Sequence, residues 1–152
     1  EAIVFEEQDD LIKAFKNNEL DKDFIAVLPF QGPKQNGMPE LHQLTPTLTI
    51  LQRRGFKVGI ITDGRMSGAS GKIPAAIHVV PEAKDGGLMS RIQTGDVILM
   101  NAITGELQCM DPQVNNRDVR TKDNSNVFGL GRELFFNMRT QVSSSEEGAS
   151  FL

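Results

Sequence analysis

Two stretches of the sequence decide the fold: FIAVLPFQGPKQNGMPE at residues 24–40 and VGIITDGRMSGASGK at residues 58–72. Each begins with a short apolar run, which is typical of a strand buried on both faces of a sheet. Each then continues into a loop rich in glycine and polar residues, and α/β proteins place binding and catalytic groups on such loops. We therefore expect buried strands at 23–30 and 57–62.

The segment between these strands predicts a helix at 45–54. Thr45 suits the N-cap, Pro46 suits the first helical position, and Gly55 suits the position just after the helix. Strand, helix and strand in this order predict a right-handed parallel crossover, so that both loops leave the same edge of the sheet. An amphipathic helix is also predicted at 7–16.

The second half of the chain has a different pattern, with short apolar runs separated by turn residues. These runs predict strands at 77–80, 88–92, 97–101 and 106–110. The last two are expected to form a hairpin, and the spacing suggests a small barrel or a second antiparallel sheet. The rest of the chain predicts a mobile polar loop at 111–126, a helix at 127–142 and a frayed tail at 143–152.

Composition indicates an ordinary globular domain. The chain has 152 residues, 39% of them hydrophobic and 24% charged, so it is expected to form one domain. A net charge of −4 argues against nucleic-acid binding. No apolar stretch is long enough to cross a membrane, and no signal peptide is visible. We expect a cytoplasmic protein without membrane or nucleic-acid partners. The sequence begins with Glu1 rather than methionine, which suggests a fragment of a longer chain.

The cysteine and histidine content limits the metal chemistry. Cys109 is the single cysteine, which fits a reducing compartment and cannot by itself hold an iron–sulfur cluster. His42 and His78 are the only histidines, and no spacing of a Cys/His metal site is present. We expect Cys109 to be a small hydrophobic residue at a strand end and His78 to be a core residue.

The second loop does not match two better-known glycine-rich loops. A nucleotide-binding P-loop needs glycine and Ser/Thr where this chain has Met66 and Ile73, which argues against a nucleoside-triphosphate site. Neither Ser67 nor Ser70 has the flanking glycines of a nucleophile elbow. From the residues alone, Ser67 is either a turn serine bonded to local backbone or a base activated by a metal or by cationic neighbours. The parallel crossover would bring it close to Glu40 at the end of the first loop.

Three cations on the two loops are candidates for binding a carboxylate or phosphate: Lys34, Arg65 and Lys72. Each alone is more often a solvated surface charge. Arg65 is the strongest candidate, because it lies within the DGR motif. Asp63 of the same motif is expected to hold the loop through an Asx turn.

The motifs GPKQNGMPELH at 32–42 and TDGRMSGASGKIPAAIHVVPEA at 62–83 resemble the C-terminal domain of the dihydroxyacid and phosphogluconate dehydratases. The resemblance is densest over 30–106 and continues more weakly to 148. It implies a swivelling β/β/α domain with a barrel-like core of mixed sheet and flanking helices. It also implies that the chain is the C-terminal part of a longer enzyme, whose N-terminal domain is its partner and whose full-length form is a homodimer.

The resemblance further implies roles for individual residues. Ser67 would be the base that removes a proton from the carbon next to the substrate carboxylate, and Glu40 would be a ligand of a magnesium ion. The substrate-binding candidates are Arg65, Lys34, Lys72, Ser70 and His42. An iron–sulfur cluster is also implied, with all its ligands in the N-terminal domain, so this chain alone is expected to be inactive.

The substrate implied is a sugar-acid phosphate. His42, Met66 and the Ala69–Ser70 pair differ from the pattern of the branched-chain members of the family and favour the phosphogluconate branch. The full enzyme would then remove water from 6-phosphogluconate to give 2-dehydro-3-deoxy-6-phosphogluconate. Two alternatives stay open: a dehydratase of another sugar acid or of a branched-chain dihydroxy acid, and a stand-alone module that binds a small molecule.

Overall fold

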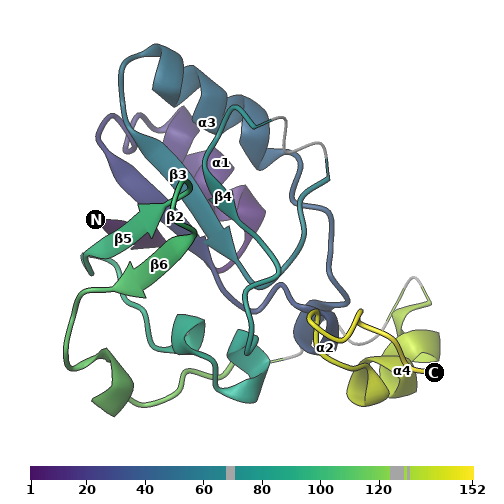
Figure 1. The fold of residues 1–152 in the computed structure, drawn as a ribbon. Helices are drawn as coiled ribbons and strands as arrows, with labels where there is room; N and C mark the ends of the chain where they lie inside the picture. The colour runs from purple at the N-terminus through teal and green to yellow at the C-terminus, as the bar shows by residue number, and fades with distance from the viewer. Residues whose placement is uncertain (68–70, 124–128, 130) are drawn as a thin grey trace.

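The computed structural model describes residues 1–67, 71–123, 129 and 131–152. Its centre is a four-stranded sheet in the order β1-β2-β3-β4 (Figure 1). The strands span β1 (Ala2–Val4), β2 (Phe24–Leu28), β3 (Val58–Thr62) and β4 (Ala75–Ala76). All neighbours run parallel, and β2 pairs with β3 in a register that places Ala26 opposite Ile60. The parallel crossover predicted from the sequence is confirmed.

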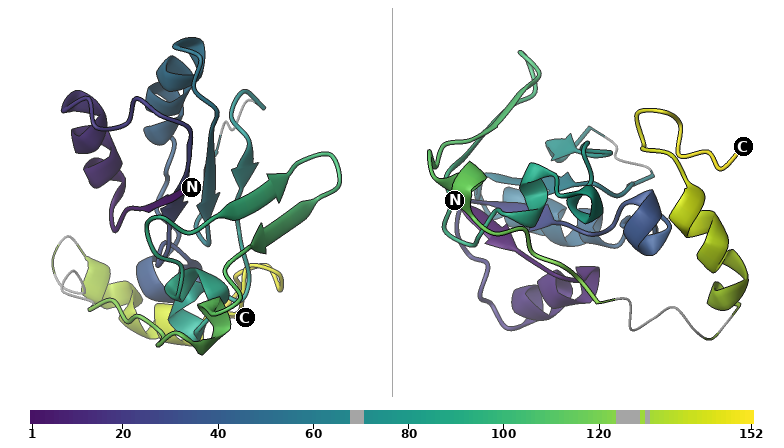
Figure 2. Two further views of the ribbon diagram at one scale, coloured as in Figure 1. Left: turned by 90° about the vertical axis from the view of Figure 1, so that its left-hand side faces the viewer. Right: turned by 90° about the horizontal axis from the view of Figure 1, so that it is seen from below.

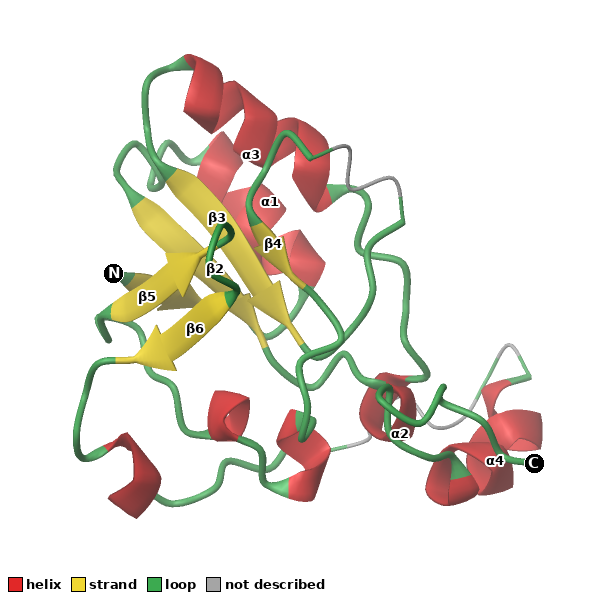
Figure 3. Cartoon of the chain, viewed as in Figure 1, coloured by secondary structure: helices red, strands yellow, loops and turns green. Residues whose placement is uncertain are grey.

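Two helices cover one face of this sheet, α1 (Gln8–Lys16) and α3 (Leu44–Arg53) (Figure 3). Alternate residues of β2 and β3 point into the core beneath them. That core includes Leu11, Phe24, Ala26, Leu28, Leu44, Leu48, Leu51, Val58 and Ile60. The helix predicted at 7–16 is confirmed, and its buried residue Leu11 contributes to this core.

The other face of the sheet is covered by a hairpin and by short 3₁₀ helices. The hairpin consists of β5 (Ile98–Asn101) and β6 (Glu106–Cys109), which pair antiparallel as predicted. The 3₁₀ helices are η1 (Ala83–Asp85), η2 (Leu88–Ser90) and η3 (Val114–Asn116). The core on this side includes Ala2, Val27, Phe30, Ile61, Ala83, Met89, Ile92 and Val114. Because both faces are covered, the continuous apolar runs of β2 and β3 are explained.

Helix α3 ends as predicted but begins earlier. Its C-terminus forms a Schellman motif, in which Gly55, at φ +99°, donates to the carbonyl of Gln52 and Phe56 donates to that of Leu51. At the other end the helix begins at Leu44, so the predicted N-cap at Thr45 is wrong. The turn before the helix is already hydrogen-bonded, which extends the helix toward the N-terminus. Pro46 is tolerated inside the first turn because amide groups there have no intrahelical acceptor.

The predicted strands at 77–80 and 88–92 are wrong. The described structure places the short strand β4 just before the first, and the second contains η2. A tight turn just before η2 explains why this segment is not a strand. The backbone of Gly87 lies so close to that of Pro81 that an added Cβ would be 1.8 Å from the Pro81 carbonyl oxygen. Parallel and antiparallel strands lie in separate sheets among the described residues, so the mixed sheet predicted for the core is not seen there. The structure is an α/β domain with a parallel sheet and a small antiparallel sheet.

The C-terminal segment lies apart from the sheet, beside the short helix α2 (Pro33–Asn36) of the first loop (Figure 2). It consists of the 3₁₀ helix η4 (Arg132–Phe135) and α4 (Phe136–Gln141), so the described part of the helix predicted at 127–142 is shorter and partly 3₁₀. The tail then closes on itself, since the amide of Ser143 donates to the carbonyl of Ser150. Fraying of this tail stays a prediction. No helix in the described ranges is long and apolar enough to cross a membrane.

Arg117 ties the segment after β6 to the turn that precedes β5. Its guanidinium forms a bidentate pair with the nearly buried carboxylate of Asp96, at 2.6 and 2.8 Å, and also bonds Asp111. The hydrogen bond from Arg117 lowers the pKa of Asp96 below its ordinary value. The segment predicted as a mobile loop at 111–126 therefore has an anchor in its described part, whereas its mobility stays a prediction.

The Arg117→Gln variant tests this anchor. Replacing it should lower the midpoint of urea unfolding, because Asp96 loses its bidentate partner. The pKa of Asp96 is depressed in the folded state. The ion pair therefore adds to the free energy of unfolding when the pH is above the ordinary aspartate pKa near 4, and this stabilisation is lost as the pH falls. The difference between wild type and variant should therefore shrink in acid. The control is Arg53→Gln at the exposed end of α3; equal losses in both variants at pH 7 would contradict the anchor.

Candidate functional site

The two motif loops are held together by the carboxylate of Asp63, directly after β3. Its oxygens accept hydrogen bonds from the backbone amides of Phe30 (3.1 Å), Gln31 (2.8 Å) and Ala83 (2.8 Å). The side chain is fully buried, and burial raises its pKa while the three amides act in the opposite direction. In place of the predicted local Asx turn, Asp63 joins three segments that are distant in sequence.

At this junction the backbones of the two loops lie unusually close together, and one residue has a strained conformation. Phe30 is buried and has φ +63°, a conformation that is uncommon for a bulky residue and occurs where surrounding contacts enforce it. Gly64 lies against the first loop, because an added Cβ would lie 2.6 Å from the Cβ of Gln31 and 2.9 Å from its carbonyl oxygen. The glycine of the DGR motif is thus required by the close approach of the two loops.

Glu40 and Ser67 lie in direct contact where the two loops meet. Oε1 of Glu40 accepts a hydrogen bond from the amide of Ser67 at 2.8 Å and from the amide of His42 at 3.0 Å. The Ser67 side chain is the main cause of the lowered pKa of this carboxylate, and the Ser67 amide and Arg65 contribute. The structure therefore brings together the two residues that the parallel crossover predicts should converge.

Arg65 completes this group. Its Nη2 lies 3.7 Å from Oε2 of Glu40, and its Nε donates to the carbonyl of Met38 at 3.0 Å. The backbones of Glu40 and Arg65 form an isolated parallel bridge, which extends the pairing of the two loops beyond the sheet. A carboxylate, a guanidinium and a hydroxyl thus lie side by side on the protein surface, where they can bind a ligand that carries carboxylate and hydroxyl groups.

The remaining predicted binding residues are distributed around this group. Lys34 forms an ion pair with Asp85, so part of its charge is already compensated. His42 contributes its backbone amide and exposes its side chain. Lys72 is exposed, without an ion pair within the part of the chain that the structure describes. Ser70 lies outside the described residues.

His78 corrects a prediction. The sequence predicts it in the core because it lies in an apolar run, but it is exposed and has φ +55°. Its amide donates to the carbonyl of Gly64 at 3.0 Å, which turns the chain out at the edge of the second loop. His78 therefore lies on the surface beside the DGR motif, where a polar side chain is accessible to solvent.

Glu82 is the residue that sequence reasoning missed. Its carboxylate is buried against the first loop, where it accepts a hydrogen bond from the amide of Lys34, and an added Cβ on Gly32 would lie 2.2 Å from its Oε2. Burial, together with the nearby charges of Asp63 and Asp85, raises the pKa of Glu82 to about 7. The signal in the sequence was its place in the second motif, but a single acid after a proline does not reveal burial.

The described residues offer only some of the ligands that the metal ions implied by the family resemblance would need. Oε2 of Glu40 accepts no backbone amide from the residues that the structure describes and is a hard oxygen donor of the kind that magnesium prefers, so Glu40 fits as one ligand. No group of three metal-binding side chains occurs among the described residues. Cys109 lies in β6 and packs against the second core, and a single thiolate does not fit an iron–sulfur cluster.

Comparison with known proteins identifies the family. Residues 1–149 match the model of the dihydroxy-acid/6-phosphogluconate dehydratase C-terminal domain. The chain belongs to this family. Both motif loops and most of the tail lie within the matched range.

Individual relatives agree with this assignment. Phosphogluconate dehydratase of Rhizobium meliloti is 53% identical over 154 residues, covering 99% of this chain and 25% of the relative. Phosphogluconate dehydratase of Pseudomonas aeruginosa is 52% identical over 148 residues, covering 96% and 24%. Dihydroxy-acid dehydratase of Methanosphaera stadtmanae is 35% identical over 122 residues, covering 78% and 22%. The chain thus spans about a quarter of the length of the curated relatives that it matches.

The raised pKa of Glu82 predicts a pH-dependent stability. Between its ordinary value of 4.5 and about 7, the folded state keeps the proton that the unfolded state has lost. The free energy of unfolding should therefore fall as the pH rises through this range, by up to about 3 kcal/mol. Glu82→Gln, which is neutral at every pH, should lose this part of the dependence.

The measurement is urea unfolding from pH 4.5 to 8 for wild type, Glu82→Gln and the exposed control Glu106→Gln. The control should keep the wild-type profile. An unchanged slope in Glu82→Gln would show that Glu82 is ionised in the folded protein throughout this range.

Proposed function

We propose that this chain is the C-terminal domain of a phosphogluconate dehydratase, which removes water from 6-phosphogluconate to give 2-dehydro-3-deoxy-6-phosphogluconate. The observation that carries the proposal is the contact between Glu40 and Ser67, which joins the two family motifs into one exposed polar group. The phosphogluconate branch is favoured over the dihydroxy-acid branch because identity is 52–53% to relatives of the first name and 35% to the relative of the second.

The reaction breaks two bonds of the substrate. The C2–H bond gives its proton to a base, the C3–O bond releases the hydroxyl group as water, and the resulting enol becomes the ketone. Ser67 is the proposed base. Arg65, whose half-exposed guanidinium lies beside Glu40, is placed to bind the carboxylate next to C2. Lys72, Lys34, His42 and Ser70 remain further candidates for substrate binding.

The charge of Glu40 bears directly on the basicity of Ser67. The hydroxyl lies beside an anionic carboxylate, and a neighbouring negative charge makes its deprotonation harder. Arg65 offsets only part of this charge at 3.7 Å. A magnesium ion bound partly by Glu40 would supply positive charge for the substrate carboxylate and for the serine oxygen. This balance supports the proposal that the chain alone lacks dehydratase activity and that the remaining ligands come from the rest of the enzyme.

The Ser67→Ala variant of the full-length enzyme tests the role of the serine. Turnover should fall at least about 10²-fold with substrate affinity nearly unchanged, because the hydroxyl acts only when the proton is transferred. The control Thr104→Ala removes an exposed hydroxyl from the turn between β5 and β6 and should behave as wild type. Wild-type turnover in Ser67→Ala would leave Ser67 as a turn residue.

The Glu40→Gln variant tests the metal ligand and should behave differently. Glutamine can still accept the amides of Ser67 and His42 through Oε1, so the loops should keep their contact while the negative charge is lost. The full-length variant should need more magnesium for activity and bind substrate more weakly. A magnesium titration of activity measures this; the same magnesium dependence and substrate affinity as wild type would exclude Glu40 as a ligand.

A further inference from the structure

A cavity of about 500 Å³ lies between α2 and the C-terminal segment. Figure 1 shows these two elements side by side at the end of the molecule opposite α3. The cavity is lined by both elements and by the tail that follows them. Its walls are mostly apolar, with side chains of Met38, Phe135, Met138, Val142 and Phe151.

Two arginines, Arg132 and Arg139, are the charged residues of this lining, and no acidic residue lines the cavity among the residues that the structure describes. Neither arginine forms an ion pair within the ranges that the structure describes. In each, one guanidinium nitrogen is buried without a hydrogen-bond partner among those residues, Nε in Arg132 and Nη2 in Arg139. Two uncompensated positive charges facing one partly apolar cavity favour an anion there.

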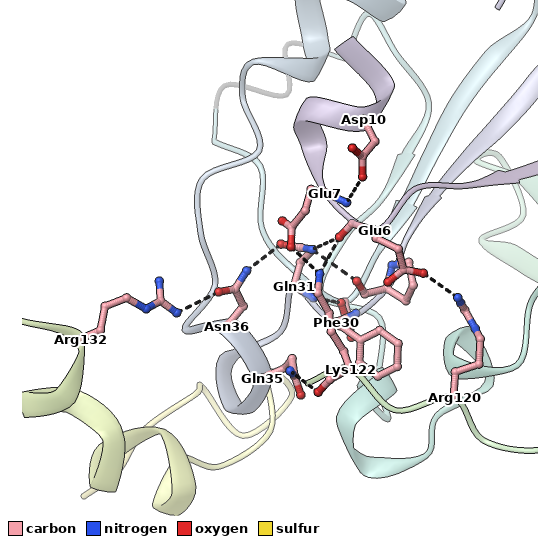
Figure 4. Close-up of polar contacts among 12 residues, drawn as sticks. Glu6, Glu7, Asp10, Phe30, Gln31, Gln35, Asn36, Arg120, Lys122 and Arg132 are labelled. Carbon is pink, nitrogen blue, oxygen red and sulfur yellow. Dashed lines mark hydrogen bonds and ion pairs between the residues drawn. The ribbon is translucent and has the colours of Figure 1, made fainter. Parts of the chain in front are cut away.

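A series of hydrogen bonds that starts at a buried residue holds the side chain of Arg132 in place. Its Nη2 donates to Oδ1 of Asn36 at 3.1 Å, and Nδ2 of Asn36 donates to Oε1 of Gln31 at 3.1 Å (Figure 4). Gln31 is buried, and its own backbone amide is held by Asp63. Nη1 of Arg139 donates to the backbone carbonyl of Arg132, so the Arg139 side chain is held against the main chain at Arg132. A side chain oriented by a buried network is suited to binding a ligand.

The cavity adjoins the group formed by Glu40, Arg65 and Ser67. Met38 lines the cavity, and its carbonyl accepts the hydrogen bond from Nε of Arg65. Glu40 follows two residues later, so its Cα is at most about 7 Å from that of Met38. The cavity and the group formed by Glu40, Arg65 and Ser67 are therefore neighbours along the first loop.

We propose that Arg132 and Arg139 bind the phosphate group of the sugar-acid substrate, while its carboxylate end lies at Arg65 and Glu40. This inference rests on the proposed function and deepens it, because it assigns the residues that distinguish phosphorylated from non-phosphorylated sugar acids. The fork of an arginine matches the geometry of phosphate oxygens, and two of them neutralise a dianion. Glu133 and Glu147 accept backbone amides of the C-terminal segment, and neither forms an ion pair with Arg132 or Arg139 among the described residues.

The first test is a titration of the 152-residue chain with inorganic phosphate, followed by NMR at the arginine side chains. Saturable shifts are expected at Arg132 and Arg139, and Arg132→Gln or Arg139→Gln should weaken phosphate binding about tenfold or more. Arg139→Lys keeps the charge and should lose less, and Arg53→Gln is the control on an exposed arginine. The amide spectrum of each variant shows whether it is folded. Unchanged binding in both glutamine variants, or no saturable shift in wild type, would overturn the proposal.

The second test uses the full-length enzyme with 6-phosphogluconate and gluconate. Arg139→Gln should lower kcat/KM about tenfold or more for the phosphorylated substrate and leave that for gluconate nearly unchanged. An equal loss for both substrates would contradict a phosphate site. If the wild-type enzyme eliminates water from neither sugar acid, the proposed function fails, and the phosphate titration decides the binding site independently.

Discussion

The hydrogen bonds that the Asp63 carboxylate accepts are the interaction on which the rest of the site depends. A buried carboxylate is costly unless its oxygens are satisfied, and here three backbone amides from two other segments satisfy them. The ends of β2 and β3 and the start of η1 are thereby fixed relative to one another. The contact between Glu40 and Ser67 requires this arrangement, because neither residue belongs to the sheet itself.

The constraint reaches beyond the two motif loops. Gln31, whose amide binds Asp63, holds Asn36 through its side chain, and Asn36 holds Arg132. A continuous set of hydrogen bonds therefore connects the end of β3 with the cavity beside α4. The strained backbone of Phe30 lies at the start of this path and is maintained by burial and by its bond to Asp63. The sheet provides a rigid base, while the polar groups that can act on a ligand lie on loops at its edge.

How far the sequence predicts this structure depends on how local the deciding contacts are. The apolar runs of β2 and β3 and the helix end at Gly55 are local signals, and each is confirmed. The parallel crossover then predicted that Glu40 and Ser67 would converge, which the structure shows. The burial of Glu82 and the role of Asp63 could not be predicted, because they depend on amides contributed by distant segments. Similarly, η2 forms where Gly87 meets the backbone of Pro81, and an apolar run alone does not reveal that contact.

Hydrogen exchange in the Asp63→Asn variant tests the central claim most directly, with the exposed Asp118→Asn as control. Asparagine replaces one carboxylate oxygen by an NH₂ group, so at least one of the three backbone bonds is lost. Exchange should then accelerate about tenfold or more at the amides bound to Asp63, and also at the amide of Ser67, which is bound to Glu40 instead. Faster exchange at Gln31 with unchanged protection at Ser67 would contradict the claim that Asp63 holds the two loops together.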